Sequence, residues 1–167
     1  MFRFIGDIQT VRNDQEKTLE KYGYVFYVTH QYFVEIDADG DCVNEVKEIG
    51  VYSRKRLAEQ AIRRFAGLPG FVKHPDGFTI AKQRCYLQRA SRVGELRTVY
   101  APYHEQYLPA SDCDEVTRGA FFEAADEAEW VLQEWRKQPK FAGAEDGYAV
   151  VEYALDEDLR FWSEGFS

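Results

Sequence analysis

An acidic turn is the part of this sequence whose spacing comes nearest to a metal site. Asp37, Asp39 and Asp41 alternate along the chain, and Glu48 follows eleven residues after Asp37. Carboxylates in this order supply the oxygen ligands of calcium-binding loops. Such loops need Gly at their sixth position, which is Cys42 here, and they join helices, whereas this turn joins two strand-like runs. We therefore expect a solvated turn, with no bound metal and no cofactor.

The histidines and cysteines show no spacing that would build a catalytic centre. His30, His74 and His104 lie far apart in the sequence, and the three cysteines include no Cys-x-x-Cys pair. An odd number of unpaired cysteines does not make a disulfide framework or a zinc site. No Ser or Cys lies in a nucleophile motif. The sequence therefore predicts no catalytic residue, favours a protein that is not an enzyme, and fits reduced thiols in the cytoplasm.

Two predicted helices carry opposite charge. The segment 54–64 has a net charge of +4, and the segment 124–137 has a net charge of −2. Acidic residues in the first turn suit the helix dipole, whereas basic residues there do not. Local stability thus explains the charge of one helix only. The difference indicates either mutual pairing or two unlike binding faces.

Trp130 is the residue most suggestive of a binding surface. At 100° per residue it lies opposite the apolar stripe of its helix, where a large aromatic side chain is typical of an interface anchor. The alternative is that residues 1–20 or the C-terminal tail cover it. The predicted partner-binding residues are Trp130, Glu127, Glu129, Glu134 and Asp126.

These helices belong to a sequence that repeats itself at a constant offset, which aligns Pro69 with Pro139. The same offset aligns Phe71 with Phe141 and Gly77 with Gly147, and eight residues between 45 and 77 are identical to their aligned counterparts. Composition alone would give about two such identities. Apolar positions of the helices persist even where identity does not, which is typical of duplicated packing.

The repeat predicts two β-β-α-β units. Their elements are strands at 24–36, 43–52 and 78–87 around a helix at 54–65, and strands at 96–107, 115–122 and 148–155 around a helix at 124–137. Ser53 is the expected N-cap of the first helix. The third strand of each unit is expected beside the first. We predict an α+β fold in which the two units are related by a pseudo-twofold, with a largely antiparallel sheet and helices on one face. The expected ranges are an arm at 1–23, units at 24–88 and 94–157, and a tail at 158–167.

Several motifs together resemble a family of short bacterial domains of unknown function. They are Gly50-Val51-Tyr52-Ser53, Leu68-Pro69-Gly70-Phe71, Pro75-Asp76-Gly77-Phe78, Tyr153-Ala154-Leu155-Asp156 and Trp162-Ser163-Glu164-Gly165-Phe166. Some members of that family lie near toxin loci and are suspected immunity proteins. The resemblance implies a pattern of turns and core residues without a catalytic residue. The second unit departs from the pattern, because Ser53 corresponds to Glu123 and Gly70 to Lys140.

Composition limits the choice of partners. The net charge of −8 opposes nucleic-acid binding and would steer a basic protein toward the chain, and no apolar run is long enough to span a bilayer. We expect a non-enzymatic protein-binding protein, such as an immunity protein that inhibits a basic toxin. The alternative is a small-ligand sensor or enzyme with a site at the junction of the two repeats. Residues that could line that site are Tyr24, Tyr27, His30, Tyr32, Tyr100, Tyr103 and His104.

Overall fold

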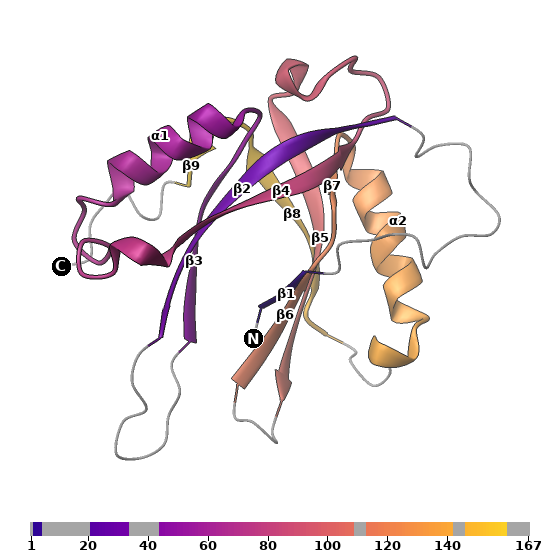
Figure 1. The fold of residues 1–167 in the computed structure, drawn as a ribbon. Helices are drawn as coiled ribbons and strands as arrows, with labels where there is room; N and C mark the ends of the chain where they lie inside the picture. Colours follow the sequence, from indigo (N-terminus) through magenta and orange to yellow (C-terminus); the bar gives the residue numbers. More distant parts are fainter. Residues whose placement is uncertain (1, 5–20, 34–43, 109–112, 142–145, 160–167) are drawn as a thin grey trace. The chain divides into compact units, whose positions relative to one another are not determined.

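The computed structural model describes residues 2–4, 21–33, 44–108, 113–141 and 146–159. Within these ranges the chain has a mixed α+β fold, with a largely antiparallel sheet and two α-helices (Figure 1). The predicted fold class is confirmed at this level. The acidic turn around Asp39 lies outside the described residues. So does the tail beyond residue 159.

The elements follow the predicted order closely. The helices are α1 (Lys55–Phe65) and α2 (Ala125–Arg136). The strands are β1 (Phe2–Phe4), β2 (Tyr22–Phe33), β3 (Asn44–Tyr52), β4 (Phe78–Tyr86), β5 (Thr98–Leu108), β6 (Cys113–Arg118), β7 (Phe121–Phe122), β8 (Tyr148–Ala154) and β9 (Glu157–Asp158).

The single strand predicted at 115–122 is wrong, because β6 and β7 are separated at Gly119. The opposing residue is Pro102 in β5, and a proline has no N–H to give to the ladder. The N–H of Gly119 donates to the Pro102 carbonyl oxygen at 3.0 Å, but Pro102 has no N–H with which to return a hydrogen bond to Gly119. A Cβ at Gly119 would lie 2.5 Å from Pro102 Cγ, so the close approach requires glycine.

The chain folds into two compact units that are discontinuous in sequence. The α1 unit comprises Val25–Lys82 with Ala154–Ser167, and the α2 unit comprises Met1–Tyr24 with Gln83–Tyr153. These boundaries differ from the continuous ranges expected from the repeat. The chain passes from one unit to the other within β2 and β4, and again at the end of β8.

In the α1 unit, the strand order is β4, β2, β3, β9, and α1 packs on β3. The placement of β2 between β3 and β4 is the order predicted for a β-β-α-β unit. Ala58, Ala61 and Phe65 form the buried side of α1. With residues of the strands and of the following loop they make a core cluster, whose other members are Val28, Ile49, Tyr52 and Phe71.

The predicted cap of α1 is wrong, because Ser53 binds a different partner. The helix begins after Arg54, whose side chain makes no capping hydrogen bond. The backbone N–H of Ser53 donates to Asp156 Oδ1 at 2.6 Å, and its hydroxyl donates to Asp156 Oδ2 at 2.7 Å. Nearby, Leu155 bridges to Val51 in parallel. Two of the motifs that carry the family resemblance, at 50–53 and 153–156, therefore meet here.

Asp156 is expected to stabilise this junction through both its carboxylate and its backbone. Its φ of 66° lies in the left-handed region, which Asp and Asn tolerate better than Ala. Replacing Asp156 with Ala should lower the free energy of unfolding by about 1–2 kcal/mol, since a charged acceptor is lost at an exposed site. Asp156→Asn keeps one acceptor and should lose less than half of that in urea unfolding. Equal losses in the two variants would contradict this role.

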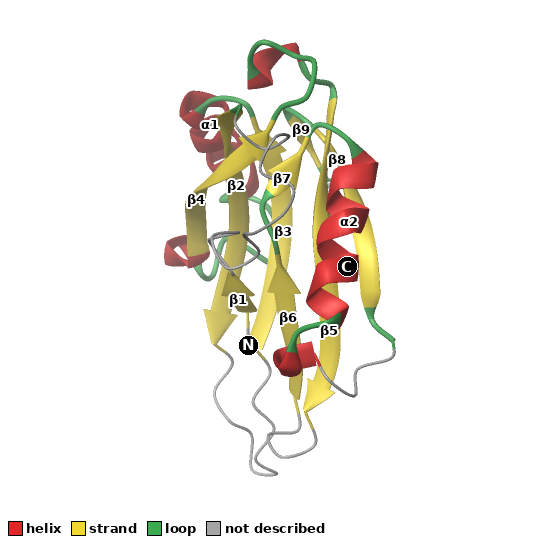
Figure 2. Ribbon diagram, turned by 90° about the vertical axis from the view of Figure 1, so that its right-hand side faces the viewer, coloured by secondary structure: helices red, strands yellow, loops and turns green. Residues whose placement is uncertain are grey.

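In the α2 unit, β5 is the central strand. It pairs in antiparallel fashion with β6 and β7 and also pairs with β8, while β1 adds to β6 in parallel. The helix α2 packs on β5 and β7 (Figure 2). The last residues of β4, Cys85 and Tyr86, pair in parallel with β7. The core cluster consists of Tyr86, Phe122, Ala128, Val131, Leu132, Trp135 and Phe141.

The Asp-Gly turns before β4 and β8 hold glycine for related reasons. Gly147 has a φ of 82°, and a Cβ there would lie 2.0 Å from the Glu105 carbonyl oxygen. A Cβ at Gly77 would lie 2.6 Å from the Gln31 carbonyl oxygen. Each turn thus packs tightly against the first strand of its own hairpin. Of these two glycines, only Gly147 has a positive φ.

Candidate binding surfaces

The helix α2 carries the predicted partner-binding residues, and its charge pattern has a local reason. Ala124, the N-cap residue before the helix, makes no side-chain capping hydrogen bond, and Asp126 and Glu127 lie in the first turn. Negative charge at this end offsets the partial positive charge of the free backbone N–H groups. Part of the acidity of α2 therefore stabilises the helix, whatever else it does.

The acidic residues of α2 differ in how available they are. Asp126 and Glu129 are exposed, although Glu129 Oε1 accepts a hydrogen bond of 2.9 Å from Gln133. Glu134 is half-buried and forms an ion pair of 2.6 Å with Lys137. Asp126 and Glu129 are thus the two predicted carboxylates that a partner could reach most easily.

Glu127 is largely removed from water. Both of its carboxylate oxygens are buried, and neither has a hydrogen-bond partner among the described residues. Burial raises the pKa of Glu127, and the nearby carboxylates of Asp126 and Glu123 add to the rise, against an opposing contribution from the Gln88 side chain. A carboxylate in this setting is poorly placed to bind a cation from solution.

Trp130 is not fully exposed, and the segments named as its alternative cover, residues 5–20 and 160–167, lie outside the described residues. Its side chain is half-buried and packs against the core cluster of the α2 unit. The helical angle places its Cα on the solvent side, but an indole is large enough to lie back over the flank of the helix. Trp130 therefore contributes to packing and offers only part of its surface to a partner.

The helix α1 differs from α2 in having a basic solvent side that packing does not explain. Its first turn has no acidic residue. Arg64 is paired with Asp158, and Lys55 lies 3.6 Å from Glu59. The exposed cations Arg54, Arg56 and Arg63 have no ion-pair partner within the described part of the chain. The described residues therefore offer no counter-charge to these three cations, of which Arg54 immediately precedes α1 and the other two lie on it.

Two histidines proposed for the alternative ligand site are buried among aromatic rings. His30 lies 4.9 Å from Phe71 and 4.6 Å from Phe78, measured between ring centroids, and its Nε2 is 2.8 Å from the carbonyl oxygen of His74. His104 lies 5.1 Å from Phe141 and 4.3 Å from Tyr148. Tyr27 is buried as well, while Tyr24 is exposed. His30, His104 and Tyr27 thus fill the interior of their units, whereas Tyr24 lies at the surface.

Burial also governs the ionisation of His104 and Cys85. Desolvation lowers the pKa of His104, against a hydrogen bond to the backbone of Asp146 that raises it. Burial raises the pKa of the Cys85 thiol to about 12, so it is not a thiolate at neutral pH. Both side chains thus remain uncharged and suit an apolar core.

Glu123 is a structural residue that sequence reasoning noted only as a departure from the motif. Its carboxylate accepts hydrogen bonds from the backbone N–H groups of Gln88 at 2.7 Å, Arg89 at 3.0 Å and Ala90 at 3.1 Å. Burial alone would raise the pKa of Glu123, but these donors outweigh it and lower the pKa. Glu123 therefore anchors the turn that follows β4. In the sequence, its alignment with Ser53 in the repeat was the only indication that this position differs in role.

No protein-family model, curated protein or solved structure matches this chain. The resemblance to short bacterial domains therefore stays a prediction. No group of three or more His, Cys, Asp and Glu side chains within the described ranges is arranged to hold a metal ion. The described helices are also too short or too polar to cross a bilayer.

Proposed function

We propose that this chain is a non-enzymatic protein that binds another protein. The observation that carries the proposal is the opposite charge on the solvent sides of α1 and α2. Each helix buries one side in its own core, so packing leaves the charge of the other side undetermined. Part of the acidity of α2 stabilises its first turn, but the basic side of α1 has no such local reason. Charge that the fold does not need is a usual feature of surfaces that select partners.

We further propose that one partner is a basic protein, in keeping with a toxin that the chain inhibits. Asp126 and Glu129 are exposed on α2, Trp130 borders them with part of its ring, and the chain has a net charge of −8. Such a field would speed association with a cationic surface and would be screened by salt. The resemblance to suspected immunity proteins points the same way.

The two halves are proposed to be copies of one β-β-α-β unit. Support comes from pairs of aligned residues in which both members are buried: Phe65 with Trp135, and Phe71 with Phe141. The parallel bridge of Leu155 to Val51 also corresponds, at the offset of the repeat, to the pairing of Cys85 with Phe121. A duplicated scaffold would keep its core and let the exposed sides of the helices diverge toward different partners.

A capture experiment tests the acidic surface. The immobilised protein should retain a basic protein from a lysate of its source organism, and binding of the purified partner should then be measured by surface plasmon resonance. Reversing Asp126 and Glu129 to Lys should slow association by about tenfold at low salt, with a smaller difference as the salt concentration rises.

The matched control reverses Glu152 and Glu157, two exposed carboxylates outside α2, and so changes the net charge equally. This control should slow association much less than the α2 variant. Equal slowing by both variants would mean that the partner senses only overall charge. Failure to capture any basic protein would argue for the small-ligand alternative.

A further inference from the structure

Each unit buries one histidine at the same place in its fold. His30 on β2 lies directly opposite Lys47 on β3. His104 on β5 lies directly opposite Thr117 on β6, and the repeat aligns Thr117 with Lys47. The repeat offset places Tyr100 at the position of His30, because the paired residues are 17 positions apart in the first hairpin and 13 in the second. The structure therefore matches two histidines that the sequence repeat does not.

Both histidine rings pack against the aromatic residue that follows the helix of their own unit. The ring centroid of His30 is 4.9 Å from that of Phe71. The ring centroid of His104 is 5.1 Å from that of Phe141. From β4, Phe78 adds an uncharged ring 4.6 Å from His30. Since the two histidines are 0% and 2% exposed, each holds an aromatic side chain in place from inside its unit.

The neutral form of each histidine suits this place, because a hydrogen bond to the backbone fixes the ring. His30 Nε2 lies 2.8 Å from the carbonyl oxygen of His74, which can only accept, so Nε2 carries the proton. His104 is hydrogen-bonded to the backbone of Asp146, and its buried Nε2 has no hydrogen-bond partner among the described residues. A second proton on either ring would therefore add a charge where water does not reach.

An ammonium group lies beside the same aromatic ring in each unit, but it comes from different positions of the repeat. Lys47 Nζ is 5.3 Å from the centre of the Phe71 ring. In the α2 unit the ammonium belongs to Lys140, which lies 5.2 Å from the centre of the Phe141 ring. Lys140 Nζ is 3.4 Å from Thr117 Oγ1, at the position aligned with Lys47. The positive charge is thus kept near each histidine although the residue that supplies it has changed.

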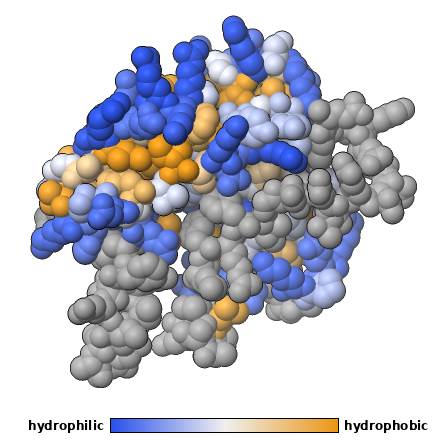
Figure 3. Space-filling view, viewed as in Figure 1, coloured by the Kyte–Doolittle hydropathy of each residue, from blue (hydrophilic) through white to orange (hydrophobic). Residues whose placement is uncertain are grey.

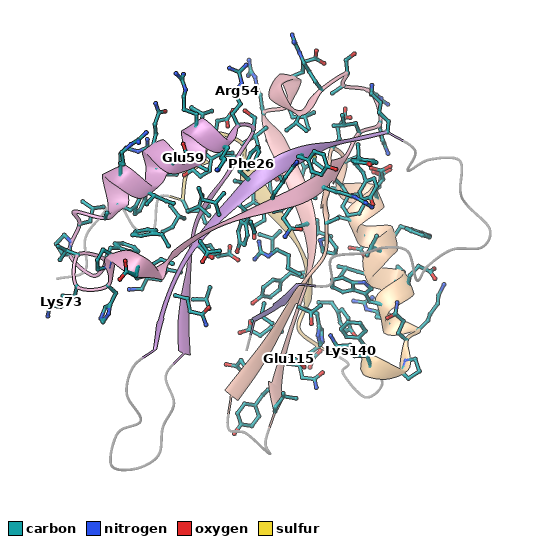
Figure 4. All side chains as sticks on the ribbon, in the orientation of Figure 1. Phe26, Arg54, Glu59, Lys73, Glu115 and Lys140 are labelled. Carbon is teal, nitrogen blue, oxygen red and sulfur yellow. The ribbon has the colours of Figure 1, made fainter. Side chains whose placement is uncertain are left out.

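The charged groups around His104 oppose its protonation more than they favour it. Burial lowers the pKa of His104, the Lys140 ammonium lowers it further, and the Glu115 carboxylate on β6 raises it. Lys140 and Glu115 are both labelled in Figure 4. From β8, the Tyr148 ring lies 4.3 Å from the His104 ring, and the Arg136 guanidinium of α2 lies 4.7 Å from the centre of the Tyr148 ring. A protonated His104 would therefore be a third cation among these groups.

We propose that His30 and His104 are a duplicated acid-sensitive latch. While its ring is neutral, each histidine holds the neighbouring aromatic residue, Phe71 or Phe141, in the core, and protonation of the ring releases that residue. A released histidine titrates near pH 6.5, whereas burial opposes protonation of the held ring. The hold is therefore present above about pH 6.5 and is lost progressively as the pH falls below that value. This inference does not depend on the partner proposed for α2.

Release would uncover apolar surface in the α1 unit. Val72, which follows Phe71, is already 56% exposed. In Figure 3 an orange area lies below the blue side chains of the upper left, in the region that α1 occupies in Figure 1. Moving Phe71 out of its core cluster would add to the exposed apolar surface of this unit. The protein would thus present more apolar surface in acid than at neutral pH.

Hydrogen–deuterium exchange of the whole protein at pH 7.5 and 5.5, corrected for the intrinsic exchange rate, measures the latch. The amide of Phe71 donates to the Leu68 carbonyl oxygen at 3.1 Å, and that of Phe141 donates to the Gln138 carbonyl oxygen at 3.0 Å. The protection of both amides should fall about tenfold or more at pH 5.5, whereas the amides of β5 should keep theirs. A local readout is needed because ionisation of Glu48 also changes global stability with pH.

Single histidine variants separate the two latches, so that each unit is the control for the other. His30→Leu should abolish the pH dependence at Phe71 and leave that at Phe141 intact. His104→Leu should do the reverse. His74→Gln replaces an exposed histidine without removing the carbonyl group that His30 contacts, and it should change neither region.

Lys140 offers a variant at an exposed position, which keeps the test valid if a buried histidine variant does not fold. Lys140→Met removes a cation that opposes protonation of His104, so the fall in protection at Phe141 should shrink by about threefold. Lys140→Arg keeps the charge and should retain the full effect. Neither variant should alter exchange at Phe71.

Three results would overturn the proposal. The first is protection at Phe71 and Phe141 that does not change between the two pH values. The second is the same pH-dependent loss in the wild type and in both histidine-to-leucine variants. The third is a loss of protection throughout β5 at pH 5.5, since acid would then unfold the unit as a whole.

Discussion

Replacing Glu48 with Gln should stabilise the protein at pH 8 and leave its stability nearly unchanged at pH 4.5. Burial raises the pKa of Glu48 from 4.5 to about 7, against a hydrogen bond from Tyr27 that lowers it. The folded protein therefore binds this proton more tightly than the unfolded chain does. The stability of the wild type accordingly falls between about pH 4.5 and pH 7 as the buried carboxyl ionises.

The expected gain for Glu48→Gln is about 3 kcal/mol above pH 7, from a shift of roughly two and a half pKa units. A neutral amide keeps an acceptor for the Tyr27 hydroxyl, which donates to Glu48 Oε1 at 2.7 Å. Urea unfolding at the two pH values measures the effect. Glu157→Gln, at an exposed carboxylate of the same unit, is the control and should show little pH-dependent gain. A gain that is equal at both pH values would contradict the proton linkage.

Phe71→Ala should cost about 3–5 kcal/mol of unfolding free energy, because a large buried ring leaves a cavity. Phe71 is fully buried, with ring centroids 5.5 Å from Phe65, 5.7 Å from Phe78 and 4.9 Å from His30. Phe141→Ala should cost a similar amount, since Phe141 is also buried and stacks on Trp135 at 5.4 Å.

The adjacent residue gives a matched control for the first of these variants. Val72 is 56% exposed, so Val72→Ala should change stability by less than about 0.5 kcal/mol. Guanidinium chloride unfolding, followed by tryptophan fluorescence, measures all three variants. A cost below about 1 kcal/mol for Phe71→Ala would mean that the ring is not part of the core.

The repeat made the elements predictable from sequence because apolar spacing and turn residues act locally. Pro69 and Gly77 mark the loop between α1 and β4, and their counterparts mark the loop before β8. The placement of β2 between β3 and β4 followed from the short hairpin and the returning helix. Buried positions such as Phe71 and Phe141 followed from the same alignment.

Other features depend on residues far apart in the sequence and were beyond local reasoning. Ser53 has the side chain of a helix cap, but Asp156 competes for it from 103 residues away. The break between β6 and β7 follows from Pro102 on the opposite strand. Trp130 was misplaced because helical angle describes where a side chain starts and not how far a large ring extends.

The binding surfaces were only partly predictable for a similar reason. Charge counts identified α2 as acidic. However, burial makes the carboxylate of Glu127 inaccessible to a partner, and Glu134 already forms an ion pair with Lys137. Sequence spacing therefore located the helices but not the surfaces that remain available on them.

The discontinuity of the α1 unit sets the order in which this protein can be completed during synthesis. Residues 25–82 leave the ribosome early, yet β3 acquires its neighbour β9 and Ser53 acquires Asp156 only after residues 154–158 have emerged. Domains usually fold in the order of their translation. Here the α1 unit, although most of it is made first, is completed only by a segment made after the other unit, and until then β3 lacks the neighbour that β9 provides.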